Sequence, residues 1–250
     1  MSRVLAVAGK GGVGKTTLSG LLVLRLAARG LAPILAVDAD PNSCLDEALG
    51  LTVQATVGSL REDLDEARRM SMDKQRYLEM KIAEALTEGE DFDLVAMGRP
   101  EGPGCYCYAN NVLKDVLARM AASYPWLVVD NEAGLENLSR RLIASSEALI
   151  LVGDGSRRGL ATMERIFELA REMGVAFEKV ALVVNRVKPG LSPLGLDELA
   201  GKTSADAVIQ LPENEQLARL DAEGAGLAGL APANPLIAGV DRLLDDLNLH

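Results

Sequence analysis

Histidine and cysteine are scarce in this sequence of 250 residues. The single histidine, His250, is the last residue, so a metal site in this chain has to use thiolates or carboxylates. The cysteines are Cys44, Cys105 and Cys107. Three thiols do not favour a disulfide framework, and the close spacing of the last two indicates metal or redox chemistry.

Long hydrophobic runs and net positive charge are missing as well. No uninterrupted apolar stretch reaches the roughly 20 residues of a membrane-spanning helix. The amino terminus leads directly into an apolar strand pattern instead of a basic, cleavable leader. The net charge of −10 disfavours nucleic acid and anionic membranes as partners. We therefore expect a cytoplasmic protein with neither partner, folded as a single domain over residues 1–250.

A glycine-rich stretch fits the phosphate-binding pattern G-x-x-x-x-G-K-[ST] at every position of residues 9–16. An apolar run of strand length precedes it, and leucines at helical spacing follow it. Such a loop turns its backbone N–H groups toward a polyphosphate. Lys15 is expected to reach the β- and γ-phosphates, and the Thr16 hydroxyl to bind Mg²⁺. The residues expected to contact the nucleotide here are Gly11, Gly12, Val13, Gly14, Lys15, Thr16 and Thr17. An ordinary glycine-rich turn is the alternative.

Aspartates follow two further apolar runs. Residues 33–37 lead into Asp38 and Asp40, and residues 126–129 lead into Asp130. Ligands of open α/β sheets bind outside the carboxyl ends of the strands, so these carboxylates are expected beside the phosphates. We expect Asp38 near the Mg²⁺ shell, Asp40 to orient or deprotonate the attacking water, and Asp130 to hold Mg²⁺ through water. A simple turn at Asp38 and Asp40 is the alternative.

Two later apolar runs end in residues suited to a nucleotide base. Asn185 follows the first run, together with Arg186, and its amide can pair with a purine edge. Pro212 and Glu213 follow the second run and are expected to lie over the base. An asparagine that merely ends a strand is the alternative for Asn185.

Residues 98–111 form a loop rich in glycine and proline that carries Cys105 and Cys107. In an extended chain, side chains two residues apart point to the same side, so both thiols can bind one metal ion. Thiolate zinc sites usually have four ligands, and a two-fold dimer would supply the missing pair. Nickel and zinc both accept such a site. Two unliganded thiols and a redox disulfide are the alternatives.

The order of apolar runs and amphipathic segments predicts the fold. About seven strand-like runs alternate with helical segments, which indicates an α/β protein with a doubly wound, mostly parallel sheet of seven or eight strands flanked by helices. Residues 59–86 have opposite charges three and four apart and are expected to form a helical insertion.

Lys10 makes the phosphate loop more specific. The loop resembles the deviant Walker A pattern K-G-G-x-G-K-[ST] of the cell-division and plasmid-partition ATPases and the nitrogenase iron protein. That resemblance implies a P-loop NTPase fold and a homodimer in which Lys10 reaches the partner's nucleotide. It also implies that Lys10, Lys15 and Asp40 are the catalytic residues, and that Asn185 contacts adenine.

The loop of residues 98–111 makes the resemblance more specific. Together with Lys10 and the Asp-Ala-Asp of residues 38–40, the segment G-R-P-x-G-P-G-C-Y-C is similar to accessory ATPases that mature the nickel enzymes carbon monoxide dehydrogenase and acetyl-CoA synthase. The resemblance spans nearly the whole chain. It implies ATP and Mg²⁺ as cofactors, Ni²⁺ at Cys105 and Cys107, and a nickel enzyme as the client.

Two other functions fit parts of the sequence. An ATP-driven electron donor resembling the nitrogenase iron protein would hold an iron–sulfur cluster between subunits. A positioning ATPase of the cell-division type would use the cysteines for a structural zinc ion. The iron protein uses two cysteines that are far apart in sequence, and Cys105 and Cys107 are arranged differently. A positioning ATPase would need a membrane helix or a DNA-binding partner, and the sequence shows no sign of either.

Overall fold

A computed structural model describes residues 2–42, 44–60, 80, 83–99, 114, 120, 123–132, 145–188 and 190–250. These residues form an eight-stranded sheet in the order β3-β4-β2-β5-β1-β6-β7-β8. The strands are β1 Arg3–Gly9, β2 Ile34–Asp38, β3 Leu86–Glu88, β4 Phe92–Ala96, β5 Trp126–Asp130, β6 Ser145–Asp154, β7 Ala176–Val187 and β8 Ala207–Pro212. Only β3 pairs antiparallel among the described strands. The prediction of a mostly parallel α/β sheet is confirmed.

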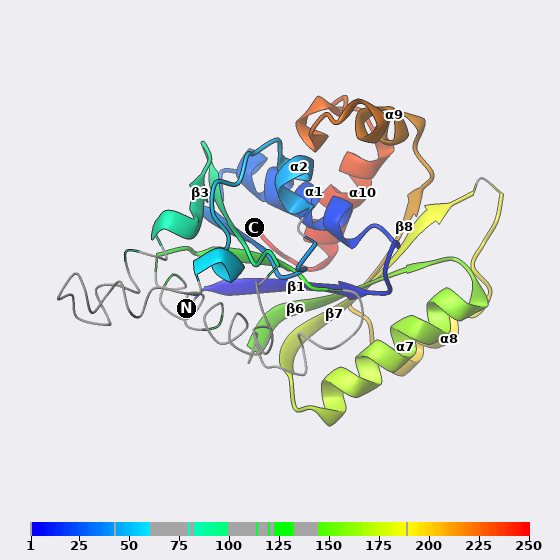
Figure 1. Cartoon of the computed structure of the whole chain (residues 1–250). Coiled ribbons are helices and arrows are strands. Elements are labelled where there is room, and N and C mark those ends of the chain that lie inside the picture. The colour runs from blue at the N-terminus through cyan, green and yellow to red at the C-terminus, as the bar shows by residue number, and fades with distance from the viewer. Residues whose placement is uncertain are drawn as a thin grey trace.

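Helices cover both faces of the sheet, as Figure 1 shows. One face carries α1, α2, α9 and α10, and the opposite face carries α7 and α8. The helices are α1 Lys15–Ala28, α2 Leu45–Leu49, α7 Arg157–Glu172, α8 Leu196–Thr203, α9 Glu215–Glu223 and α10 Pro235–Asp246, with 3₁₀ turns at Val57–Leu60 and Leu227–Gly229.

The apolar alternation of the strands builds a core on each face. In β1, Leu5 and Val7 pack with the cluster under α1 and α10, whereas Ala6 and Ala8 belong to the cluster under α7. All four side chains are almost fully buried. Because successive side chains of a strand point to opposite faces, a strand covered on both sides has to be apolar throughout.

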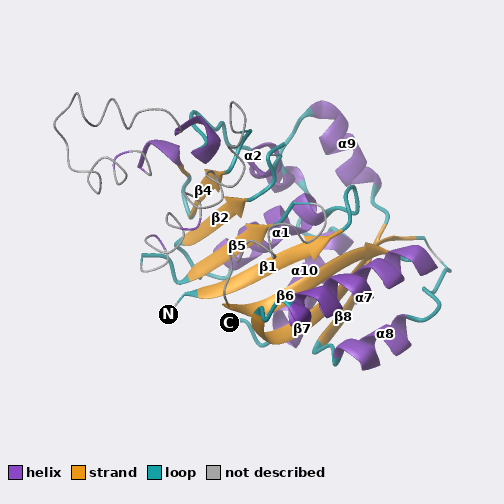
Figure 2. Ribbon diagram, turned by 60° about the horizontal axis from the view of Figure 1, so that its bottom comes forward, coloured by secondary structure: helices purple, strands orange, loops and turns teal. Residues whose placement is uncertain are grey.

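The parallel strands bring their carboxyl ends to one edge. β1 lies between β5 and β6, and β5 lies between β1 and β2 (Figure 2). Asp38 at the end of β2 is in register with Asp130 at the end of β5. Asp154 at the end of β6 is in register with Asn185 on β7. The residues predicted to bind nucleotide therefore emerge together.

Two parts of the chain differ from the sequence expectation. The glycine- and alanine-rich stretch 222–233 fits a mobile connection by composition, but it includes a 3₁₀ turn whose Leu227 packs against Gly20 of α1. Leu227 and Leu230 are 4% and 6% exposed, so apolar burial orders this stretch. Leu86, placed in the helical insertion, instead begins β3 and pairs with Val95. Residues 61–79 of that insertion lie outside the described part.

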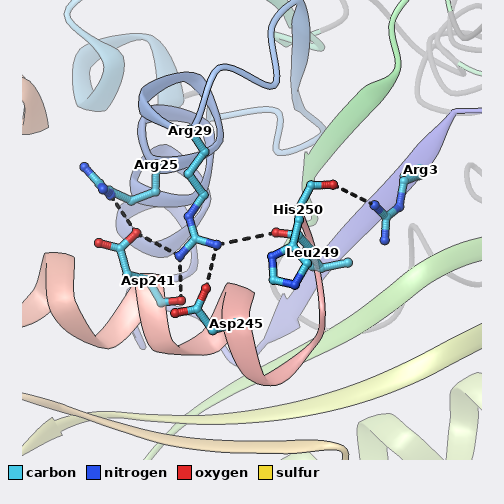
Figure 3. Close-up of polar contacts among 7 residues, drawn as sticks. All are labelled: Arg3, Arg25, Arg29, Asp241, Asp245, Leu249 and His250. Carbon is cyan, nitrogen blue, oxygen red and sulfur yellow. Dashed lines mark hydrogen bonds and ion pairs between the residues drawn. The ribbon is translucent and has the colours of Figure 1, made fainter.

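The carboxyl-terminal segment is tied to the amino ends of the strands. In Figure 3, Arg25 and Arg29 of α1 both contact Asp241 of α10, at 2.9 and 3.2 Å. Arg29 also reaches Asp245 at 2.8 Å, and Arg3 donates to the carbonyl of His250. Within the described residues, no helix has both the length and the apolar character for crossing a bilayer.

Candidate nucleotide-binding site

The loop between β1 and α1 has the backbone that its glycines permit. Gly12 and Gly14 have φ angles of 77° and 94°, a region that residues with a Cβ rarely adopt. At Gly9, the last residue of β1, an added Cβ would lie 2.3 Å from the carbonyl oxygen of Val152 on β6. The close approach of β6 therefore requires glycine at this position. α1 begins at Lys15, and its first N–H groups and positive dipole end face the loop. This is the geometry of an anion site at a helix start.

The two lysines of the loop have different surroundings. Lys15 is 7% exposed, and its Nζ donates to the carbonyl oxygen of Lys10 at 3.3 Å. Lys10 itself is exposed. Hydrogen bonds from Ser156 hold the pKa of Asp154 below its ordinary value, and the charge of Lys10 adds to this shift. The buried ammonium of Lys15 can neutralise phosphate bound in its own subunit. The exposed ammonium of Lys10 can reach a neighbouring molecule.

Asp38 organises the chain that follows β2. Its carboxylate accepts backbone N–H groups from Asp40 at 3.0 Å, Cys44 at 2.9 Å and Leu45 at 3.0 Å. Burial nevertheless raises the pKa of Asp38 to about 6, because loss of water outweighs these donors. The side chain thus has a structural function that its position in the sequence does not reveal. Placement near Mg²⁺ stays a prediction.

Asp130 has the properties expected of a carboxylate that faces a cation. It is 1% exposed, and burial raises its pKa to about 7. The hydrogen bond from Thr16 and the charge of Lys15 lower this pKa, whereas the charge of Asp38 raises it further. Its Oδ1 has no hydrogen-bond partner among the described residues. Asp38 and Asp130 are buried carboxylates in register, their pKa values are about 6 and about 7, and one oxygen of Asp130 has no partner among the described residues. This arrangement fits a divalent cation that is held together with the Thr16 hydroxyl.

Asp40 lies at the surface end of the same loop and is half-buried. Its Oδ1 accepts the backbone N–H of Asn42 at 2.8 Å and the Asn42 amide at 3.1 Å. This local turn is the structural alternative that the Asp-Pro sequence allows. It also fixes the direction of the carboxylate, which suits a group that has to orient water.

Asn185 contacts the phosphate loop directly. Its Nδ2 donates to the carbonyl oxygen of Val13 at 2.9 Å, and its Oδ1 accepts the N–H of Arg186. An amide has two N–H donors and an oxygen with two lone pairs, so one donor and one lone pair remain for an adenine N7 and N6. Arg186 has a left-handed φ of 57° and donates to the carbonyl oxygen of Gly12 at 3.1 Å.

The end of β8 completes this side of the site. Pro212 is its last residue, and the N–H of Glu213 donates to the carbonyl of Val187, next to the strand end that carries Asn185. A cavity of about 220 Å³ opens beside Thr16 and Thr17, with α2 and α9 as its other walls. Asn185 and Arg186 therefore lie against the phosphate loop at the start of α1, and Glu213 lies next to the end of their strand.

The cysteine pair Cys105 and Cys107 lies outside the described residues, so the predicted metal site stays a prediction. The third cysteine, Cys44, is exposed and free. Its pKa is raised by burial and by the carboxylates of Asp38 and Glu47. The part of the chain that the structure describes contains no group of three or more histidine, cysteine or acidic side chains arranged for a metal ion.

Sequence reasoning missed three residues of this site. Asn42 binds the carboxylate of Asp40, Arg99 binds Asn42, and Asp154 lies close to the charge of Lys10. Asp154 ends an apolar run as Asp38 and Asp130 do, which is a signal that could have identified it. Arg99 is 57 positions from Asn42, and nothing local in the sequence links them.

Comparison with known proteins agrees with this geometry. Residues 4–227 match the model of the CobQ/CobB/MinD/ParA nucleotide binding domain. An uncharacterised ATP-binding protein of Methanocaldococcus jannaschii is 41% identical, with 98% of both chains covered. The carbon monoxide dehydrogenase accessory protein CooC of Rhodospirillum rubrum is 26% identical, over 92% of this chain and 90% of that protein.

The same fold occurs in a solved structure. The septum site-determining protein MinD of Pyrococcus horikoshii, in complex with Mg-ADP, superposes with a TM-score of 0.72 at 19% identity, covering 100% of this chain and 97% of that one. The likeness at this identity concerns the fold. The family match extends over most of the chain and includes the phosphate loop, the aspartates at the strand ends and Asn185. This chain therefore belongs to the CobQ/CobB/MinD/ParA family of nucleotide-binding ATPases.

Proposed function

We propose that this protein is a Mg·ATP-dependent ATPase that dimerises, binds nickel between its subunits at Cys105 and Cys107, and serves in nickel insertion into carbon monoxide dehydrogenase or acetyl-CoA synthase. The observation that carries the proposal is the exit of β4. Met97, which follows β4, donates its N–H to the carbonyl of Asp38 at 2.8 Å, so the described start of the loop 98–111 lies next to the chain that follows β2 and carries Asp40. The relative CooC, a carbon monoxide dehydrogenase accessory protein, supports a client of that kind.

Hydrolysis follows from the residues at the strand ends. Water attacks the γ-phosphorus of ATP, the bond to the β–γ bridging oxygen breaks, and ADP and phosphate leave. Asp40 orients the water and accepts its proton, while Lys15 stabilises charge on the phosphate oxygens. Thr16 and, through water, Asp38 and Asp130 would hold Mg²⁺, which would supply positive charge to the β- and γ-phosphates. Lys10 of the partner subunit completes the site.

The metal links the same two subunits. One chain provides two thiolates, and a two-fold axis provides two more, which makes a four-thiolate site for Ni²⁺ or Zn²⁺. Coupling requires that nucleotide and metal prefer different arrangements of the dimer. The ion is cargo for the client, and ATP turnover changes the affinity with which the dimer holds it.

An anaerobic metal titration tests the cysteine site. Wild type is expected to bind about one Ni²⁺ per two chains, and a Cys105→Ala/Cys107→Ala double variant to lose this binding. Cys44→Ala is the matched control, because it removes the exposed third thiol and leaves the pair intact. Unchanged nickel binding by the double variant rejects the site. Iron with acid-labile sulfide in protein purified without oxygen would instead support the electron donor.

Sedimentation with and without ATP tests the cross-subunit lysine. Lys10→Ala is expected to bind ATP but to lose ATP-dependent dimerisation and hydrolysis. Arg165→Ala is the control, because Arg165 is an exposed cation in the middle of α7, away from the loop. Full turnover by Lys10→Ala would show that the lysine has no role across the interface.

A further inference from the structure

Three polar side chains join the exits of β2 and β4. Arg99 Nη2 donates to Asn42 Oδ1 at 2.5 Å, and Asn42 Nδ2 donates to Asp40 Oδ1 at 3.1 Å. The backbone N–H of Asn42 reaches the same Asp40 oxygen at 2.8 Å. A guanidinium, an amide and a carboxylate thus form one chain of hydrogen bonds that ends on the predicted catalytic group.

The backbone on the β4 side is fixed by described contacts. Gly58 donates its N–H to the carbonyl of Met97 at 2.7 Å. Gly98 has a φ of 62°, and a Cβ added there would lie 2.3 Å from the Thr56 hydroxyl oxygen. Since Met97 and Gly98 are both held, the position from which the Arg99 side chain starts is set by the fold, and its contact with Asn42 has a defined direction.

The order of donors and acceptors allows only one orientation of the amide. Asn42 presents its oxygen to the guanidinium and its NH₂ group to the carboxylate. The reverse orientation would place the NH₂ group against the guanidinium donor and the oxygen against the carboxylate. Arg99 and Asp40 therefore select the amide rotamer of Asn42. A cation on the amide oxygen also polarises the N–H that contacts Asp40, which strengthens this hydrogen bond.

We infer that Arg99 is a positioning residue for hydrolysis, because through Asn42 it sets the direction of the Asp40 carboxylate. This inference depends on contacts between described residues, and it rests on the proposed function of Asp40 in hydrolysis.

Single-turnover and steady-state ATPase assays on Arg99→Ala, Asn42→Ala and the double variant test the positioning role. Each single variant is expected to lower kcat about tenfold, with the KM for ATP within about twofold, because the water is misplaced and the nucleotide is not. The double variant is expected to have the same kcat as the single variants, since both substitutions interrupt the same series of hydrogen bonds. Arg99→Lys keeps a donor for Asn42 and is expected to recover part of the loss.

Arg165→Ala is again the control and should keep the wild-type kcat. Unchanged kcat in Arg99→Ala overturns the inference. So does a double variant about a hundredfold slower than wild type, which would mean that the two residues act independently. A rise in KM with unchanged kcat overturns it as well, because that result describes a binding residue.

If wild type binds no nickel in the metal titration, the proposed nickel function fails, while the kcat comparison still decides the positioning role of Arg99.

Discussion

The two ends of the sheet differ in how they place their charged groups. At the amino ends of the strands, Glu147 contacts both Arg3 and Lys179, at 2.9 and 3.1 Å, and the Arg3 contact is the main reason that its pKa is lowered. At the carboxyl ends, burial raises the pKa values of Asp38 and Asp130 to about 6 and about 7. One end stabilises the fold, and the other keeps unfavourable charge where a cation and phosphates are expected to bind.

Asp130→Asn should give the largest effect and change activity and stability in opposite directions. Loss of the cation-facing carboxylate is expected to lower ATPase activity about a hundredfold. Without Mg²⁺ at pH 8, the free energy of unfolding should rise by about 2 kcal/mol, because a buried charge is removed. Urea denaturation and an ATPase assay measure the two quantities.

The pH dependence of this stability difference has a definite sign. The folded-state pKa of Asp130 is about 7, above the ordinary value of 3.8, so the folded protein binds the proton more tightly than the unfolded chain does. Ionisation therefore costs wild-type stability progressively as pH rises from about 4 to above 7. The advantage of Asp130→Asn should shrink when urea denaturation is repeated at pH 6 and 5. A constant advantage would contradict the raised pKa.

Arg29→Ala tests the other end of the sheet and comes next in size. Arg29 of α1 binds the Asp241 carboxylate and carbonyl and forms an ion pair with Asp245 at 2.8 Å. Its removal should lower the free energy of unfolding by about 2 kcal/mol, since a part-buried network loses its central donor. The kcat for ATP should stay within about twofold.

Arg242→Ala is the matched control on the same helix. Its ion pair with Asp246 is 3.6 Å long and the side chain is 73% exposed, so little change in stability is expected. If Arg29→Ala lowered kcat strongly at unchanged stability, the two ends of the sheet would not be separate in function.

Mg²⁺ affinity should depend on pH in the range set by the two aspartates. Protons compete with the cation for Asp38 and Asp130, whose pKa values are about 6 and about 7. Lowering the pH from 7.5 to 6 should weaken Mg²⁺ binding about tenfold. Titration with a fluorescent ADP analogue measures this, after correction for titration of the free nucleotide. A flat profile would show that neither carboxylate faces the cation.

Much of the fold and part of the site could be predicted because they depend on local patterns. Apolar runs that end in Asp38 or Asp130 predict both a buried strand and the position of its last side chain. The phosphate loop has its glycines at the required spacing, and the observed φ angles of Gly12 and Gly14 agree with it. In contrast, the 3₁₀ turn after helix α9 buries Leu227 in the core, which composition does not reveal.

The missed features of the site are contacts between distant residues. The Asn185 amide binds a carbonyl 172 positions away in the chain, and Arg99 binds Asn42 across 57 positions. Asp38 anchors a loop by accepting three backbone N–H groups. An aspartate at the end of a strand does not by itself predict these contacts. Such functions follow from the order of strands in the sheet, which sequence patterns leave open.

Arg186 gives the smallest expected effect and separates backbone strain from binding. Its left-handed φ of 57° is unfavourable for a residue with a Cβ, and its guanidinium donates to the carbonyl of Gly12. Both Arg186→Gly and Arg186→Ala remove this donor, so each should raise the KM for ATP about threefold. Glycine relieves the strain, and we expect this gain to exceed the cost of the entropy that glycine adds to the unfolded chain. Alanine keeps the strain and should be less stable than glycine by about 1 kcal/mol in urea denaturation. An alanine variant as stable as the glycine variant, or more stable, would show that strain at this position is no larger than the entropic cost of glycine.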